Sequence, residues 1–230
     1  MWTSLLTQHR AIAIIRAPEF EVGLEMARSV ARGGLHLIEI TWDSPEPQRL
    51  IETLRSELPN CTIGTGTIVT VDQLKSAIAC GAQFAFSPHC NPAIIEAANL
   101  AKLPIVPGAL TPTEILTAWN AGADSVKVFP VSALGHASYI KSLRDPLKGI
   151  PLIPTGGVTL ENAAEFLAAG AIAVGLSTSL FPIEWVRDRS WNQVRDRAKQ
   201  LCDRLHLLNL GVRGDGFGLG LGGGDDVRIA

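Results

Sequence analysis

The sequence has no run of 18 or more apolar residues, so no segment of it is a candidate transmembrane helix. The first ten residues include Gln8, His9 and Arg10 and lack a long apolar core followed by a small-residue cleavage site, which argues against a secretory signal. The net charge of −2 gives no excess of positive charge for binding nucleic acid or an acidic membrane. We therefore expect a cytoplasmic protein that acts on a small molecule.

Cysteine is also scarce. Cys61, Cys80, Cys90 and Cys202 form no CxxC motif and have no metal-ligand spacing. A chain of 230 residues with 47% hydrophobic residues can build a large core without disulfides. We expect four reduced cysteines that mainly pack, and neither a metal nor a cofactor.

A repeated helix ending indicates the fold. Gly34, Gly81, Gly122 and Gly170 each end a helical pattern and are followed at once by an apolar run. They lie 47, 41 and 48 residues apart, which is long for one βα unit and suits two.

Apolar segments at this spacing divide into eight expected strands. These are 11–16, 36–41, 62–67, 84–87, 104–107, 125–129, 152–155 and 172–176. The expected helices between and after them include 21–32, 45–58, 71–79, 113–120 and 185–208. Eight alternating β and α units predict a single-domain (β/α)8 TIM barrel. The alternative, an open doubly wound sheet, lacks a GxGxxG motif after the first strand.

The end of the chain has a different composition. The helix expected over 185–208 would close a barrel domain spanning 1–208. Residues 209–230 hold eight glycines, and Asp225 and Asp226 are adjacent. Such a segment buries too little to offset its ordering entropy, so we expect a disordered tail.

Lys127 interrupts an apolar strand. Val126 and Val128 share one face of the strand, so Lys127 points to the other. If the valines face the helices, Lys127 faces the barrel lumen near the C-terminal end of the strand, where barrel active sites lie. Burial there lowers a lysine pKa and yields the neutral amine that attacks carbonyls. The alternative is a buried structural ion pair with Glu39.

Glu39 interrupts a second strand in the same way. It shares one face with Thr41, while Ile38 and Ile40 share the other. A carboxylate in an apolar strand is costly unless something pairs with it, and the lumen offers Lys127. We expect Glu39 to shuttle protons between amine and substrate. The alternative is an ion-pair partner without a role in proton transfer.

Other polar residues stand at expected strand ends. Arg16, Thr67, Ser87 and Thr155 each close a strand, and Arg16 could pair with a substrate carboxylate.

Two later loops carry glycines and hydroxyls. Gly156 and Gly157 follow the seventh expected strand, and Ser177 and Thr178 follow the eighth. Loops at these positions form the phosphate site of many barrels, so we expect a phosphorylated substrate.

Six motifs follow one another along the chain, namely Ile-Glu-Ile-Thr, Gly-Thr-Gly-Thr, Phe-Ser-Pro-His, Pro-Gly, Val-Lys-Val-Phe-Pro and Pro-Thr-Gly-Gly. Together they resemble one family, the 2-keto-3-deoxy-6-phosphogluconate (KDPG) / 2-keto-4-hydroxyglutarate (KHG) aldolases, and the resemblance runs from about Ala11 to Pro182. It implies a class I aldolase that cleaves KDPG reversibly to pyruvate and glyceraldehyde 3-phosphate, with 4-hydroxy-2-oxoglutarate as a further substrate that would give pyruvate and glyoxylate.

The resemblance also implies roles for individual residues. Lys127 would form the Schiff base and Glu39 would be the acid/base, while Thr67 and Thr155 would line the pyruvyl pocket. The phosphate would be held by a set of four residues, namely Gly156, Gly157, Ser177 and Thr178. The family assembles as homotrimers, so a homotrimer is expected.

Two features depart from the family pattern. Many members carry an arginine where this chain has Asp43, so Arg16 would have to supply the charge that binds a substrate carboxylate. The glycine-rich segment after Leu208 has no counterpart in the compact family barrel.

Two other functions would suit parts of the pattern. Another phosphate-binding barrel, such as a sugar-phosphate epimerase or a thiamin-phosphate synthase-like enzyme, explains the late loops but gives Lys127 no task. The histidines His36, His89 and His136 are also scattered and form no obvious metal set. A non-catalytic barrel explains neither lumen residue.

Overall fold

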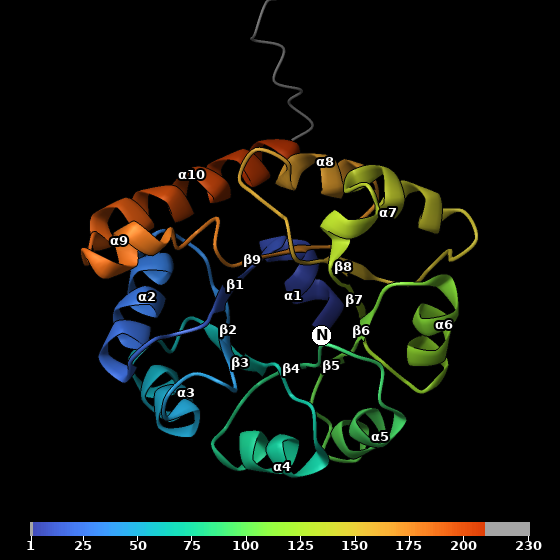
Figure 1. Cartoon of the computed structure of the whole chain (residues 1–230), viewed down its shortest axis with the longest axis horizontal. Helices are drawn as coiled ribbons and strands as arrows, with labels where there is room; N and C mark the ends of the chain where they lie inside the picture. Colours follow the sequence, from blue (N-terminus) through green and yellow to red (C-terminus); the bar gives the residue numbers. More distant parts are fainter. Residues whose placement is uncertain (1, 210–230) are drawn as a thin grey trace, which may run out of the picture.

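The computed structural model describes residues 2–209, in which parallel strands form the inner wall of a ring and helices cover the outside (Figure 1). The strands are β1 Ala11–Ile15, β2 Leu37–Thr41, β3 Thr62–Gly66, β4 Ala85–Phe86, β5 Ile105–Val106, β6 Gly108–Ala109, β7 Val126–Val128, β8 Leu152–Pro154 and β9 Val174–Leu176. Two sheets have the orders β5-β4-β3-β2-β1-β9 and β6-β7-β8. The fold is therefore α/β with a curled parallel sheet.

Helices precede the first strand, connect most of the strands and follow the last one. They are α1 Trp2–His9, α2 Phe20–Arg32, α3 Pro47–Glu57, α4 Val71–Ala79, α5 Pro92–Leu100, α6 Pro112–Asn120, α7 Ala137–Arg144, α8 Ala163–Ala168, α9 Ile183–Arg187 and α10 Trp191–Asn209, with a 3-10 turn at Val131–Leu134. Their apolar faces and the outer face of the sheet bury one continuous core.

The sheet differs from the single run of eight strands that the sequence predicts. Pro107 has no N–H to donate. The strand expected over 104–107 is β5, and the two residues after Pro107 form β6, which belongs to the other sheet. The other end strands of the two sheets are β8 and β9, and there an isolated parallel bridge joins Thr155 to Gly175.

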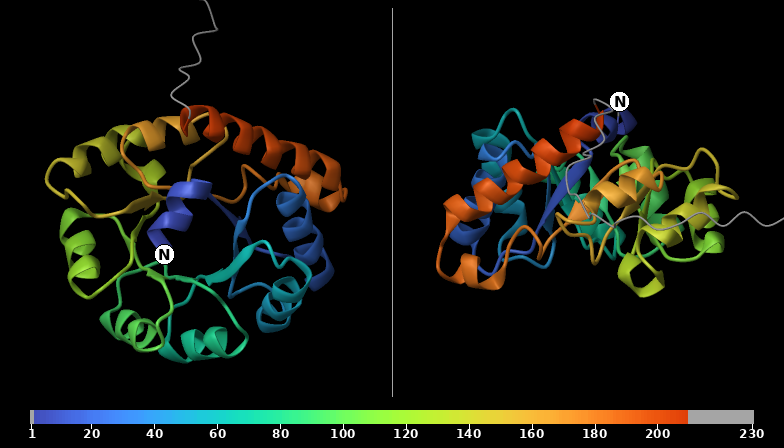
Figure 2. Two further views of the ribbon diagram at one scale, coloured as in Figure 1. Left: turned by 180° about the vertical axis from the view of Figure 1, so that it is seen from behind. Right: turned by 90° about the horizontal axis from the view of Figure 1, so that it is seen from above.

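An unexpected helix fills the lumen at the N-terminal ends of the strands. Figure 2 shows α1 lying across the centre of the ring when the molecule is seen from behind. Trp2 Nε1 donates to Ser125 Oγ at 3.1 Å, and the Trp2 ring lies 5.0 Å from that of Phe84. Trp2, Leu6 and Phe84 belong to a second core inside the ring, so α1 closes one end and leaves the other for a site.

The end of the chain also departs from expectation. The helix expected over 185–208 is broken into α9 and α10, and Arg189 between them has a positive φ of 52°. Asn209, assigned to the tail, is instead the last residue of α10. The disorder expected for the rest of the tail concerns residues that lie outside the described part of the chain.

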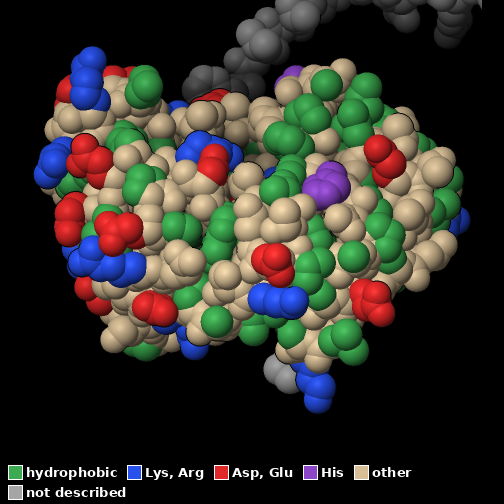
Figure 3. All heavy atoms as spheres, turned by 60° about the horizontal axis from the view of Figure 1, so that its bottom comes forward, with side chains coloured by type: hydrophobic (Ala, Val, Ile, Leu, Met, Phe, Trp, Pro, Cys, Tyr) green, Lys and Arg blue, Asp and Glu red, His purple; other side chains and the backbone are tan. Residues whose placement is uncertain are grey.

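The surface carries charges of both signs. On the face in Figure 3, Lys and Arg side chains stand among Asp and Glu, with most charges on the left and more hydrophobic side chains on the right.

All four cysteines are free thiols. Within residues 2–209 no helix is long and apolar enough to span a membrane, and no group of His, Cys, Asp and Glu has the arrangement of a metal site.

Candidate active site

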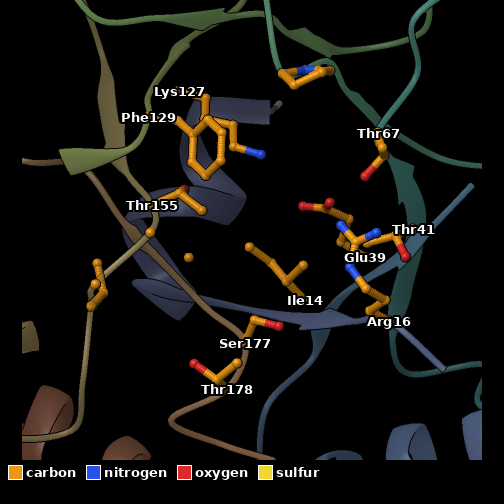
Figure 4. A pocket seen from close by; sticks show the side chains of 15 residues that line it. Ile14, Arg16, Glu39, Thr41, Thr67, Lys127, Phe129, Thr155, Ser177 and Thr178 are labelled. Atoms are coloured by element: carbon orange, nitrogen blue, oxygen red, sulfur yellow. The ribbon is translucent and has the colours of Figure 1, made fainter. Parts of the chain in front are cut away.

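A cavity of about 180 Å³ opens at the C-terminal ends of the strands, opposite α1 (Figure 4). Each residue to which the sequence assigns a catalytic or substrate-binding role lines it. The lining consists of Ile14, Arg16, Glu39, Thr41, Thr67, Pro88, Lys127, Phe129, Thr155, Gly156, Gly157, Val158, Gly175, Ser177 and Thr178. The sheet thus brings together side chains from β1, β2, β7 and the loops after β3, β8 and β9.

Lys127 reaches the cavity from the middle of β7. Val126 and Val128 pack in the outer core, so the strand's alternation turns Lys127 inward, where its side chain is 6% exposed. Its Nζ lies 4.7 Å from the centre of the Phe129 ring. Burial lowers the pKa of Lys127, Glu39 raises it in part, and the positive charge of Arg16 lowers it further.

Glu39 enters from β2 and is 1% exposed. Burial raises the pKa of Glu39, while Lys127 and Arg16 lower it. Among the described residues its Oε2 is one of the few buried side-chain atoms without a hydrogen-bond partner. Gly66 makes room for this carboxyl, because a Cβ at Gly66 would collide with Glu39 Oε1. The second glycine of Gly-Thr-Gly-Thr is therefore a requirement of the site.

The amine and the carboxyl face each other across open space. Figure 4 shows Lys127 and Glu39 pointing into the cavity from opposite walls. No ion pair between them occurs among those found in residues 2–209, although each shifts the pKa of the other. A nucleophile and a proton carrier can thus reach the same substrate atom from two sides.

Two threonines stand beside this pair. Thr67 has a φ of 62°, which is rare for a β-branched residue and indicates local backbone strain at the cavity. Thr155 follows β8 and is 6% exposed. Its hydroxyl donates a long hydrogen bond to Ile153 O at 3.5 Å and can still accept one from a small polar ligand.

The opposite side of the cavity carries backbone donors. Gly156 and Gly157 have φ values of 80° and 93°, and a Cβ at Gly157 would lie 2.5 Å from that of Ser132. Within the described structure neither glycine N–H donates to a protein acceptor. Ser177 and Thr178 lie on the neighbouring loop (Figure 4). This arrangement suits a phosphate group.

Some features of the site were not predicted. No role in the site was predicted from sequence for six further lining residues, namely Ile14, Thr41, Pro88, Phe129, Val158 and Gly175. Phe129 could have been predicted, because it stands two residues after Lys127 and therefore on the same face of the strand. Ser87, expected in the cluster of strand ends, does not line the cavity, and its hydroxyl bonds to His89 instead.

Comparison with known proteins gives one family. The model of the family described as "KDPG and KHG aldolase" matches residues 3–197. A curated 2-dehydro-3-deoxy-phosphogluconate aldolase of Treponema pallidum is 30% identical, over 88% of this chain and 97% of the relative. A KHG/KDPG aldolase of Escherichia coli K12 is 25% identical, over 89% and 96%.

Comparison with solved structures gives the same family. A KDPG aldolase of Legionella pneumophila, in which pyruvate was captured as a covalent carbinolamine intermediate, has a TM-score of 0.81 and 26% identity, over 87% of this chain and 98% of that one. A 3-hexulose-6-phosphate synthase has a TM-score of 0.65 at 16% identity, which is a likeness of fold alone.

Proposed function

We propose, from the premise that the chain belongs to the KDPG and KHG aldolase family, that it cleaves 2-keto-3-deoxy-6-phosphogluconate reversibly to pyruvate and glyceraldehyde 3-phosphate. As a member of this family it is an aldolase, a lyase. The observation that carries the proposal is the placement of a buried lysine and a buried glutamate on opposite walls of one small cavity.

Lys127 starts the proposed reaction. Its neutral Nζ attacks the C2 carbonyl of the keto acid and forms a carbinolamine, because burial lowers the lysine pKa. Glu39 gives a proton to the departing hydroxyl, which leaves as water, and an iminium ion remains. A carboxyl whose pKa is raised by burial suits this step, because burial favours its protonated form, which can give the proton.

Cleavage uses the same two residues. Glu39, now ionised, takes the proton of the C4 hydroxyl. The C3–C4 bond breaks and its electron pair moves into the iminium, which becomes an enamine as the aldehyde leaves. Protonation at C3 and hydrolysis of the imine then release pyruvate and the free amine, so the cycle needs no cofactor.

The remaining lining residues bind the substrate in this proposal. Thr67 and Thr155 contact the pyruvyl part, and Arg16 supplies charge for a carboxylate. The phosphate would be held by the Gly156–Gly157 turn together with Ser177 and Thr178. We expect kcat/KM to favour the phosphorylated substrate by about 10-fold or more, because the phosphate gains charge-assisted hydrogen bonds. 4-Hydroxy-2-oxoglutarate is a second proposed substrate.

Trapping with borohydride tests the mechanism. Pyruvate and borohydride should leave a reduced adduct on Lys127 that peptide mass spectrometry locates. Lys127→Ala should abolish the adduct, whereas the same change at the exposed Lys141 should not affect it. An adduct elsewhere would contradict the assignment, and no adduct would favour a phosphate-binding barrel that acts without an imine.

We also propose that the two sheets act as one closed eight-strand barrel, with β5 and β6 as one interrupted strand. Two hydrogen bonds across the seams support this: Lys127 N donates to Pro107 O at 2.9 Å, and Ile172 N donates to Leu152 O at 3.0 Å. Closure predicts slow hydrogen exchange at both amides. The proposed domain spans 1–208, followed by a dispensable tail at 209–230.

A homotrimer in the cytoplasm completes the proposal. Leu100 is 81% exposed, and Leu116 and Trp119 on the neighbouring α6 are also exposed. The ends of the two helices touch, since Asn99 Nδ2 approaches Ala121 O at 3.5 Å. Covering these side chains with another copy would stabilise an assembly. Light scattering after size exclusion should give three times the mass of the chain.

A further inference from the structure

Arg16 and Asp43 form an ion pair at the rim of the cavity. Arg16 follows β1 and lines the cavity, whereas Asp43 follows β2 and does not. Nη1 of Arg16 contacts Oδ2 of Asp43, and the two side chains are 56% and 47% exposed. Asp43 therefore holds the guanidinium from outside while the rest of the group faces the substrate space.

A buried serine fixes the two loops that carry this pair. Ser44 is 4% exposed, and its Oγ accepts a hydrogen bond from Ala17 N at 3.0 Å. The same Oγ lies 3.1 Å from Thr41 Oγ1. The residues beside Arg16 and Asp43 are thus tied together, which lowers the entropy cost that makes most exposed ion pairs weak.

The charges at the cavity cancel. Three lining residues can be charged, namely Arg16, Glu39 and Lys127. Lys127 and Glu39 sum to zero whether both are neutral or both are ionised. Arg16 and Asp43 also sum to zero. The entrance therefore offers hydrogen-bond donors without a net positive charge.

We propose that Asp43 is a specificity-determining residue, which sets how strongly the site selects keto acids by their negative charge. This inference rests on the proposed aldolase function. By neutralising Arg16, Asp43 moderates the advantage of phosphorylated substrates. The site then also accepts hydroxylated keto acids whose single charge is the carboxylate.

Asp43→Asn tests this with little change of shape. The substitution leaves Arg16 with a net positive charge, and a phosphorylated substrate has about two more negative charges to interact with it than an unphosphorylated one. We expect the ratio of kcat/KM for phosphorylated over unphosphorylated 2-keto-3-deoxygluconate to rise about 3- to 10-fold, mainly through KM. Added salt should reduce the increase, since it screens exposed charges.

Glu46→Gln is the matched control. It removes one negative charge from the same connection, but Glu46 pairs with Arg49, which does not line the cavity. Its ratio should equal that of the wild type. An unchanged ratio in Asp43→Asn would overturn the proposal. So would an equal loss on both substrates, because Asp43 would then only position Arg16.

Equilibrium binding separates this inference from the proposed function. Titration with pyruvate, which has one negative charge, and with 3-phosphoglycerate, which has about three, needs no turnover. Asp43→Asn should tighten binding of 3-phosphoglycerate by a larger factor than binding of pyruvate. This result would support the role of Asp43 even if no imine can be trapped on Lys127, and equal factors would contradict it.

Discussion

Burial shifts the pKa values of Lys127 and Glu39 in opposite directions, and both shifts favour the uncharged form. A neutral amine is a nucleophile and a protonated carboxyl is an acid, so burial in one cavity suits both to the proposed carbonyl chemistry. Arg16 adds to the effect at the amine, because a nearby positive charge disfavours protonation of Lys127.

The pH dependence of imine formation should report the depressed pKa of Lys127. The amine must lose its proton before it attacks, so the rate should fall on the acid side at a pH well below 10.5, the ordinary lysine value. Arg16→Gln removes a charge that lowers this pKa, so the acid limb should move to higher pH. Single-turnover reactions with pyruvate, quenched with borohydride, measure it. A limb near 10.5 in the wild type, or a shift to lower pH in the variant, would contradict this.

Glu39→Gln tests the proton carrier. Glutamine keeps the size and polarity of the side chain but cannot exchange a proton, so turnover should fall about 10²- to 10⁴-fold. Slow imine trapping should persist, because Lys127 is unchanged. Steady-state assays of aldehyde release measure the loss, and near-normal turnover would reduce Glu39 to a structural partner.

Alternation along single strands explains which residues could be predicted. Lys127 and Glu39 each stand between two apolar residues, and this local pattern alone turns them inward. The contact of Arg16 with Asp43 was not predictable in this way, because it joins loops after different strands. The left-handed backbone of Thr67 likewise has no signal in its residue type.

At the scale of elements, local signals located α4 but not α1. Helix α4 spans the predicted residues 71–79, and Thr70 accepts a hydrogen bond from Gln73 N at its start. Helix α1 has eight residues and is held by contacts with distant strands, such as that of Trp2 with Ser125. The proline at 107 is visible in the sequence as a possible interruption of a strand. The sheets that β5 and β6 join, however, depend on the strands beside them.

Trp2→Ala should weaken the packing of α1 inside the ring of strands. The change removes a 6%-exposed ring that contacts Phe84 and leaves Ser125 without its donor. We expect the free energy of unfolding to fall by about 3–5 kcal/mol, measured by urea denaturation. Trp2→Phe, which keeps most of the packing, should cost less. A loss below about 1 kcal/mol in Trp2→Ala would mean that α1 contributes little to the native state.

At the scale of the whole molecule, the curled sheet is what assembles the site. Its lining residues lie between positions 14 and 178 in sequence, yet they share one cavity because all the strands run parallel and end on the same face. The sequence could predict this convergence from the count and order of βα units. It could not predict the size of the cavity, which depends on how the side chains of several strands pack together.

The segment after α10 should be dispensable for folding and catalysis. Residues 209–230 hold eight glycines and no apolar periodicity, so their burial would not repay the entropy of ordering them. Deleting 210–230 should change the free energy of unfolding by less than about 0.5 kcal/mol and leave kcat/KM unchanged.

Truncation after Gln200 is the control, because it also removes Leu201 and Leu205, which are buried. It should cost several kcal/mol, at about 2–5 for each buried leucine. A large drop in the melting temperature of the shorter deletion would show that the segment packs on the rest of the protein.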